Sequence, residues 1–297
     1  MKYLRTLPIS SLFTLKTLWQ LRLRIKLFLG VNRSYSNFAL LIIITLFLFS
    51  FESNSFAQSQ KSFSFGEKLK YKVYYGFING GEAVLEVRKG EYEGKVANHL
   101  YLNGKTVGLA STLYNVDDTY ESFTDPQTDW PYYSIRKIHE NRYRHFSTQT
   151  WDHWSRADSS IVVSSKTGKV VVVKGCQDIL SSFYYLRHQM LKNRPQKDQL
   201  IIVDTYFTDE KFPLMVRFKG YETVKTKFGE VQCMKFMPVV QTGRVFKSKD
   251  DMTIWFSNDD NFIPIRIRFE IFVGSVYCDL VDYSGLQNPF KSLKSKD

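Results

Sequence analysis

Residues 265–283 read IRIRFEIFVGSVYCDLVDY and contain the clearest structural signal of the chain. Apolar side chains alternate with other side chains from Ile265 to Val273, and alternation with a period of two is typical of a half-buried β-strand. Gly274-Ser275 offers a two-residue turn of the Gly-X type, which predicts a hairpin whose second strand is 276–283. We therefore expect an antiparallel sheet with one buried face.

The same alternation recurs in short runs after residue 60. Residues 70–75 and 83–87 flank Asn79-Gly80-Gly81, where glycine would supply the positive φ of a tight turn. Residues 160–165 and 170–174 flank a second predicted turn at 166–169. Asn258 to Asn261 are four short polar residues that can bond to their own backbone, which predicts a further turn. Most of the chain is therefore predicted to be β.

One segment, residues 177–193, departs from this pattern. Its apolar residues recur at spacings of three and four, as in a helix: Ile179, Leu180, Phe183, Leu186 and Met190. Asp178 lies where the positive end of the helix dipole would be, and Pro195 follows the end. The fold class expected from the sequence is mainly β, a curved antiparallel sheet or open barrel packed around this one longer helix. A shorter helical turn is expected at 108–114.

The beginning of the chain is typical of an export signal. Residues 38–51 (FALLIIITLFLFSF) carry no charge, follow a basic region, and precede Ser55 and Ala57 at the −3 and −1 positions of a cleavage site. A run of 14 residues is shorter than the roughly 20 that a spanning helix needs. We expect a signal peptide over 1–57, cleavage after Ala57, and a single β-rich exported domain over 58–297 in the periplasm. An uncleaved anchor is the alternative.

Two further features of the predicted signal peptide concern its length and its cleavage point. Residues 1–36 are either a long n-region or the product of a start codon assigned too far upstream. No cysteine lies near the cleavage point, so we expect no lipid anchor.

Composition and charge exclude two broad classes. An aromatic content of 16% with 43% apolar residues is that of a folded chain rather than a disordered one. The net charge of +12 resembles that of a nucleic-acid-binding protein, but residues 1–57 hold seven Lys and Arg against one acid, so half of the charge belongs to the leader. We expect no nucleic-acid partner.

The three cysteines, Cys176, Cys233 and Cys278, match no zinc-binding spacing. At most one intramolecular bridge can form from an odd number. Cys233 and Cys278 stand in apolar runs, where a buried cysteine behaves as a small hydrophobe. We expect that no bridge is needed for folding.

Motifs for catalysis are mostly absent. His139-Glu140 begins like a zinc-protease helix, but Tyr143 stands where the second His ligand should be. The sequence contains no nucleophile elbow, phosphate loop, Cys-x-x-Cys or dinucleotide turn. Asp117-Asp118 is interpreted as the start of a strand, because neighbours on a strand point to opposite faces. No metal site and no cofactor are predicted, and a non-catalytic protein is favoured over an enzyme.

A basic stretch with interleaved aromatics lies between residues 135 and 146. It holds Arg136, Lys137, Arg142 and Arg144 beside Tyr143 and Phe146. In an envelope compartment, such a stretch could bind the head groups of phospholipid or lipopolysaccharide, or acidic glycans. The favoured interpretation is a solvated strand face on which cations protect a sheet edge.

A family resemblance covers about residues 63–286. It begins with Phe65-Gly66-Glu67-Lys68-Leu69-Lys70-Tyr71, Tyr74-Tyr75-Gly76 and Gly80-Gly81. It continues with Asp118, Tyr120, Gln177-Asp178, Ser181, Tyr184-Tyr185, Gly229, Cys233, Phe236, Gly243 to Phe246, Ile254-Trp255, Pro264, Gly274, Leu280 and Tyr283. In these residues the chain resembles the bacterial exported family known as domain of unknown function 3108. The resemblance implies a periplasmic, mainly antiparallel β protein, and it carries no catalytic residue or cofactor. The architecture is also similar to carriers that ferry lipoproteins, which is an analogy of fold and does not transfer function.

Three hypotheses for function follow. The first is a periplasmic binding or carrier protein for an apolar or amphipathic envelope ligand, such as a lipid or a lipoprotein-like ligand. Its candidate ligand-binding residues are Ile179, Phe183, Leu186, Met190, Arg142 and Arg144. The second is an envelope interaction module that pairs a sheet edge with a partner protein. The third is an unrecognised enzyme. The oligomeric state stays open.

Overall fold

The computed structural model describes residues 60–239, 252–271 and 273–294. The predicted leader and the Gly243 to Phe246 part of the family resemblance lie outside these ranges. The chain divides into Met1–Gln58 and Ser59–Asp297, and only the second unit is described below. None of the helices in the described ranges has the length and hydropathy needed to cross a membrane.

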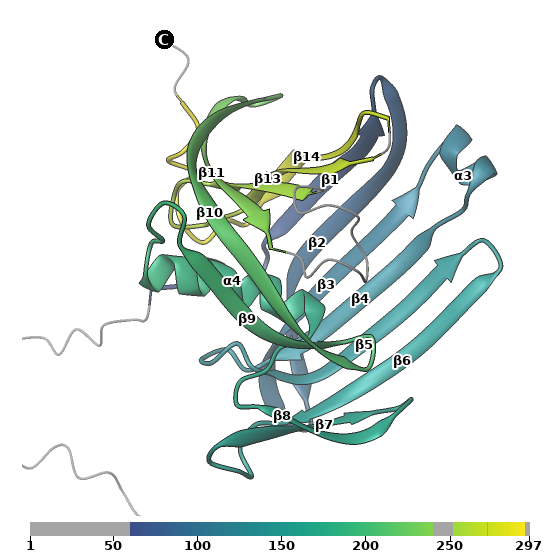
Figure 1. The fold of residues 1–297 in the computed structure, drawn as a ribbon, viewed down its shortest axis with the longest axis vertical. Helices are drawn as coiled ribbons and strands as arrows, with labels where there is room; N and C mark the ends of the chain where they lie inside the picture. The colour runs from purple at the N-terminus through teal and green to yellow at the C-terminus, as the bar shows by residue number, and fades with distance from the viewer. Residues whose placement is uncertain (1–59, 240–251, 272, 295–297) are drawn as a thin grey trace, which may run out of the picture. The chain divides into compact units, whose positions relative to one another are not determined.

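The described residues form two helices and fourteen strands (Figure 1). The strands are β1 (Lys68–Tyr75), β2 (Ile78–Tyr92), β3 (Lys95–Thr106), β4 (Asp117–Thr124), β5 (Pro131–Glu140), β6 (Tyr143–Asp152), β7 (Ser159–Ser164), β8 (Gly168–Val173), β9 (Leu200–Phe207), β10 (Glu210–Thr226), β11 (Gly229–Pro238), β12 (Met252–Ser257), β13 (Pro264–Glu270) and β14 (Ser275–Ser284). The helices are α3 (Leu109–Leu113) and α4 (Ile179–Lys192).

All strands belong to one antiparallel sheet of two meanders. The strand order is β8-β7-β6-β5-β4-β3-β2-β1-β14-β13-β12-β11-β10-β9, so β1 pairs with β14 where the meanders meet. The chain segment after β8 bonds to the other edge strand: Gln177 N–H donates to the Asp204 carbonyl at 2.9 Å, and Tyr206 N–H donates to the Gln177 carbonyl at 2.9 Å. This bridge makes the curved sheet a nearly closed barrel, as the sequence led us to expect.

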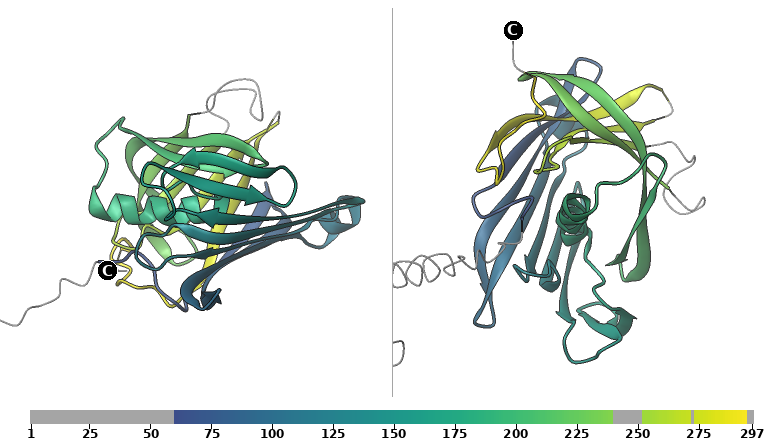
Figure 2. Two further views of the ribbon diagram at one scale, coloured as in Figure 1. Left: turned by 90° about the horizontal axis from the view of Figure 1, so that it is seen from below. Right: turned by 90° about the vertical axis from the view of Figure 1, so that its left-hand side faces the viewer.

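The helix α4 connects the two edge strands and lies within the curve of the sheet (Figure 2). Its N-cap is Asp178, whose carboxylate accepts from the N–H groups of Leu180 and Ser181 at 2.9 Å, and the Ser181 hydroxyl accepts from the Asp178 N–H at 3.0 Å. Such a reciprocal cap satisfies the free donors of the first turn. The predicted helix over 177–193 is thus confirmed, with its first turn starting two residues later.

Most of α4 is buried, as expected for a helix surrounded by sheet. Leu186 and Met190 pack into an apolar cluster with β9 to β12, which includes Val216 and Phe236. On another side, Leu180 and Tyr184 pack with Phe63 and with Val87 and Leu100 of β2 and β3. The helix therefore joins the cores of the two meanders.

The predicted hairpins at 160–174 and 265–283 are present as β7–β8 and β13–β14. The strand β13 ends at Glu270, so Ile271 and Val273 are exposed rather than on the buried face. The predicted short helical turn at 108–114 is α3, and β4 starts at Asp117 as expected.

The predicted turn at Asn79-Gly80-Gly81 is wrong. The turn between β1 and β2 is at Gly76, whose φ is +55°, and Asn79 to Gly81 belong to β2. A bulge at Gly80 shifts the register there. A Cβ at Gly81 would come within 2.8 Å of the Lys105 carbonyl oxygen, so this glycine serves close packing between strands and not chain reversal.

Candidate functional site

A cavity of about 440 Å³ lies between α4 and the inner face of the sheet. Its lining is almost entirely apolar and comes from both meanders: Tyr71, Ala83, Leu85, Leu102, Tyr120, Ile179, Leu180, Ser182, Phe183, Leu186, Phe207, Leu214, Val216, Pro238, Met252, Ile254, Phe256, Pro264, Ile267, Phe269 and Cys278. An apolar space of this size is within the usual range for small-molecule sites, about 300 to 1,000 Å³. It is therefore the strongest candidate site within the described residues.

One face of α4 supplies the helical wall of the cavity. Ile179, Phe183 and Leu186 follow one another at spacings of four and three, which places them on one face, with Ser182 beside them. The Ser182 hydroxyl donates to the Ile179 carbonyl at 2.8 Å, so it presents no free donor to the cavity.

A buried ion pair of α4 fixes the position of the helix. The Arg187 guanidinium donates to both carboxylate oxygens of Glu67, at 2.6 and 2.7 Å, and neither side chain is exposed. It also donates to the carbonyls of Asn261 at 2.9 Å and Ser62 at 3.0 Å. The positive charge of Arg187 is neutralised by the carboxylate of Glu67 through two hydrogen bonds, as a buried Arg requires. Since these partners come from two chain segments, one before β1 and one between β12 and β13, they hold α4 at a set distance from the sheet.

A second polar contact lies one residue further along the helix. The His188 Nδ1 contacts the Asp129 carboxylate, and the His188 ring stacks on Phe63 with centroids 4.4 Å apart. Phe63 also lies near the Arg187 guanidinium, with 5.4 Å from Cζ to the ring centroid. These contacts add to the anchoring of α4.

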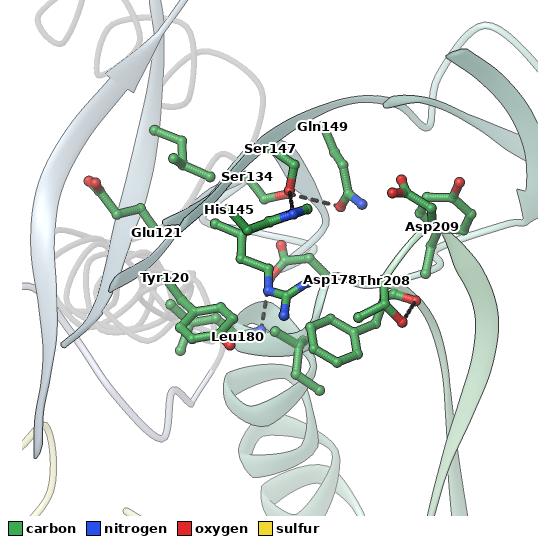
Figure 3. A pocket seen from close by; sticks show the side chains of 15 residues that line it. Tyr120, Glu121, Ser134, His145, Ser147, Gln149, Asp178, Leu180, Thr208 and Asp209 are labelled. Atoms are coloured by element: carbon green, nitrogen blue, oxygen red, sulfur yellow. Dashed lines mark hydrogen bonds between the residues drawn. The ribbon is translucent and has the colours of Figure 1, made fainter. Parts of the chain in front are cut away.

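A small polar pocket of about 30 Å³ adjoins the apolar cavity (Figure 3). Four residues line both spaces: Tyr120, Ile179, Leu180 and Phe207. The remaining lining is mostly polar and comes from β4 to β6, the start of α4 and the β9–β10 turn: Glu121, Ser134, Ile135, Arg136, His145, Ser147, Gln149, Asp178, Tyr206, Thr208 and Asp209. In Figure 3, Ser134, Ser147 and Gln149 lie on the strand side of the pocket, and Asp178 and Leu180 lie at the first turn of α4.

The titratable groups at this pocket differ in their partners. The Asp178 carboxylate accepts from the Ser122 hydroxyl at 2.5 Å, and burial raises the pKa of Asp178. The His145 Nε2 lies 3.0 Å from the Ser147 hydroxyl oxygen, and burial, together with the charge of Arg136, lowers the pKa of His145. The Arg136 Nε is buried and has no hydrogen-bond partner among the described residues.

The structure brings three of the six predicted site residues together. Ile179, Phe183 and Leu186 line the cavity, whereas Met190 is buried in the cluster beyond its end. Arg142 and Arg144 are exposed at the β5–β6 turn. Arg144 lines a separate groove, and its guanidinium donates to the Asn141 and Tyr143 carbonyls at 2.6 and 2.9 Å. The role of all six in binding stays a prediction.

Arg136 belongs to the basic stretch but is not among the six predicted site residues. Its strand register distinguishes it, because Arg136 pairs with Tyr120 and Ser147 on the inner face of the sheet. Knowledge of the pairing of β4 with β5 would identify Arg136 as a residue of the inner face, but the sequence alone does not give that pairing.

All three cysteines are free thiols, with Cys176 and Cys233 buried. Burial raises the pKa of each thiol to about 12, which makes them inert at neutral pH. Within the described ranges, no group of three or more His, Cys, Asp or Glu residues could hold a metal ion.

Comparison with solved structures identifies similar folds. A beta-barrel-like protein of domain of unknown function DUF1849 from Brucella abortus aligns with a TM-score of 0.50 and 12% identity, over 74% of this chain and 98% of that chain. A DUF1329 family protein from Desulfovibrio piger aligns over 76% of this chain and 88% of that chain, at 9% identity and a TM-score of 0.20, which is too low to establish a shared fold. The first alignment supports the barrel-like architecture.

Comparison with curated proteins gives no match. The profile of one protein family, described as "Protein of unknown function (DUF3108)", matches residues 70–281. The matched range runs from within β1 to within β14 and includes α4 and all of the cavity lining. The chain therefore belongs to the DUF3108 family.

Proposed function

We propose that this protein is a non-catalytic binding or carrier protein that holds an apolar or amphipathic ligand in the cavity beside α4. The cavity of about 440 Å³ and its apolar lining carry the proposal. An apolar cavity of about 150 Å³ already binds benzene, so a space of this size suits a considerably longer hydrocarbon.

We further propose that the protein acts in the periplasm, where its ligand would be an envelope lipid or the acyl part of a lipoprotein. This step depends on the sequence of the leader, with its uncharged run and the small residues at Ser55 and Ala57. Lipids are poorly soluble in the aqueous space between two membranes, and an apolar cavity is the chemistry that would carry them.

A cavity-filling variant tests the proposal. Ala83 lines the cavity from β2, and Ala83→Trp would place an indole in that space. Val84 is its neighbour on the opposite face of the strand, so Val84→Trp is a matched control.

Protein purified without detergent would be extracted and its lipids measured by mass spectrometry. We expect bound lipid in the wild type and in Val84→Trp, and at least a tenfold decrease in Ala83→Trp. Absence of lipid from the wild type, together with no binding of added fatty acid or fatty alcohol, would reject the proposal.

The exposed edge of β8 favours one second candidate, an interaction module that binds an extended segment of a partner protein. The outer side of β8 has no strand partner among the described residues, and Val171 and Val173 on it are 42% and 50% exposed. Such an edge can add a strand from another chain. If this is the function, Val171→Lys with Val173→Lys would abolish partner binding and leave lipid binding unchanged.

A further inference from the structure

The inner face of the sheet changes from apolar to polar along one row of paired residues. Leu85 of β2 pairs with Leu102 of β3, Leu102 with Tyr120 of β4, Tyr120 with Arg136 of β5, and Arg136 with Ser147 of β6. Partners in adjacent antiparallel strands share a face of the sheet. The first three line the apolar cavity, and the last two line the small polar pocket. The two spaces are thus neighbouring parts of one amphipathic interior.

Arg136 is the unpaired charge in this interior. It forms no ion pair within the described part of the chain, and its Nε is buried without a hydrogen-bond partner. Its guanidinium lies beside two aromatic rings that line both spaces, at 6.0 Å from the Tyr120 centroid and 5.2 Å from that of Phe207. A partly buried guanidinium without a carboxylate is a strong candidate to bind an anion.

The acids around the polar pocket are already engaged elsewhere. Asp178 accepts from Ser122 and from the first turn of α4. Asp209 accepts from the Ser164 hydroxyl at 2.6 Å and from the Thr167 hydroxyl at 3.2 Å. Glu121 lies 2.8 Å from His99 and 3.6 Å from Lys137. None of these three acids forms an ion pair with Arg136 in the described residues. The guanidinium hydrogen-bonds with the neutral Tyr120 side chain, so its charge has no carboxylate partner there.

We propose that Arg136 binds the carboxylate of a long-chain acid whose hydrocarbon tail occupies the apolar cavity. The pocket volume of about 30 Å³ has room for about two water-sized groups, which fits the two oxygens of a carboxylate. The planar guanidinium fork matches that head group in geometry as well as charge. The Ser134 and Ser147 hydroxyls line the same pocket and are able to donate further hydrogen bonds.

This inference rests on the proposed function, and the test separates the two. Lipid-stripped protein would be titrated with hexadecanoic acid, hexadecanol, acetate and a single-chain lysophosphatidylglycerol, because the last carries a phosphate in place of the carboxylate. Arg136→Gln removes the charge. Arg156→Gln is the matched control, since Arg156 is an exposed arginine between β6 and β7 and lines neither space.

We expect hexadecanoic acid to bind at least tenfold more weakly to Arg136→Gln than to the wild type. Hexadecanol should bind Arg136→Gln and the wild type equally, and Arg156→Gln should bind the acid as the wild type does. Acetate should not bind, because it has no tail. If Arg136→Gln does not fold, Arg136→Lys keeps the charge without the fork, and it should weaken binding of the acid but not of the alcohol.

Equal binding of the acid to Arg136→Gln and to the wild type would reject the role of Arg136 while leaving the cavity proposal intact. An effect of Arg136→Gln on the lysophospholipid alone would overturn the carboxylate assignment. Failure of both acid and alcohol to bind the wild type would reject the proposed function itself.

Discussion

Truncation of Phe183 should destabilise the protein far less than truncation of a phenylalanine in its filled core. Phe183 is partly buried and lines the cavity, and its ring contacts Phe256 with centroids 5.5 Å apart. Phe218 is the matched comparison, since it is 1% exposed and packs in the neighbouring cluster between Tyr221 and Phe236, both with centroids at 5.2 Å.

The expected loss of unfolding free energy depends on the empty volume that each truncation creates. Phe218→Ala removes a fully packed ring and creates a new void, which costs about 3 to 5 kcal/mol. Phe183→Ala enlarges a space that already exists, so the void adds little, and the loss of partial burial costs about 1 to 2 kcal/mol. In a domain of this size, 1 kcal/mol shifts Tm by about 2 to 4 °C. Phe218→Ala should therefore lower Tm by about 6 to 20 °C and Phe183→Ala by about 2 to 8 °C.

The assays are urea unfolding and thermal unfolding, both followed by circular dichroism, with binding of the apolar dye N-phenyl-1-naphthylamine measured on the folded variants. Phe183→Ala should change the amount of dye bound, and Phe218→Ala should not. Equal destabilisation by both variants, with dye binding unaffected by either, would show that the space beside α4 is ordinary core and would refute the reasoning.

Three further outcomes are expected. Arg187→Met leaves the Glu67 carboxylate buried without its partner, which should cost about 3 to 5 kcal/mol in urea unfolding, whereas the double variant with Glu67→Gln should recover part of that loss. Burial lowers the pKa of His153 from 6.5 to about 4, so the folded state resists protonation. The stability due to neutral His153 is therefore fully present above pH 6.5 and is lost as the pH falls toward 4, by up to about 3 kcal/mol. A His153→Gln variant should show a flatter dependence of unfolding free energy on pH, and an unchanged slope would contradict this assignment. Intact-mass measurement of periplasmic material should give a mature chain that begins at Gln58, and a product that retains residues 38–57 in the membrane fraction would instead indicate an anchored protein.

The sequence predicted those features that depend on local periodicity. Spacings of three and four identified α4, and alternation identified β13 and β14. The buried residues of each element recur with the period of its backbone, so the sequence shows that period. The turn predicted at Asn79-Gly80-Gly81 is wrong because a β-bulge and a tight turn both favour glycine. Only the partner strand distinguishes the two, and the partner is not a local property.

The candidate site was predictable only on its helical side. Ile179, Phe183 and Leu186 followed from the helix periodicity. The sheet side depends on register: Tyr120 and Arg136 are 16 positions apart in the chain but are direct partners across β4 and β5. Whether a ring of apolar residues fills its interior or leaves a cavity depends on side-chain volumes summed over both meanders, which no single segment reveals.

The pairing of β1 with β14 has a consequence for how the protein reaches its native state. Lys68 is the partner of Ser284, and Tyr75 is the partner of Val276, so the seam between the meanders joins residues some two hundred positions apart. Contacts of such long range require closure of nearly the whole chain before they stabilise anything, and they make folding slow. The edges of β1 and of the incomplete first meander therefore stay open during synthesis until the last strand has emerged. During that interval, the nascent chain is most exposed to aggregation and most dependent on chaperones.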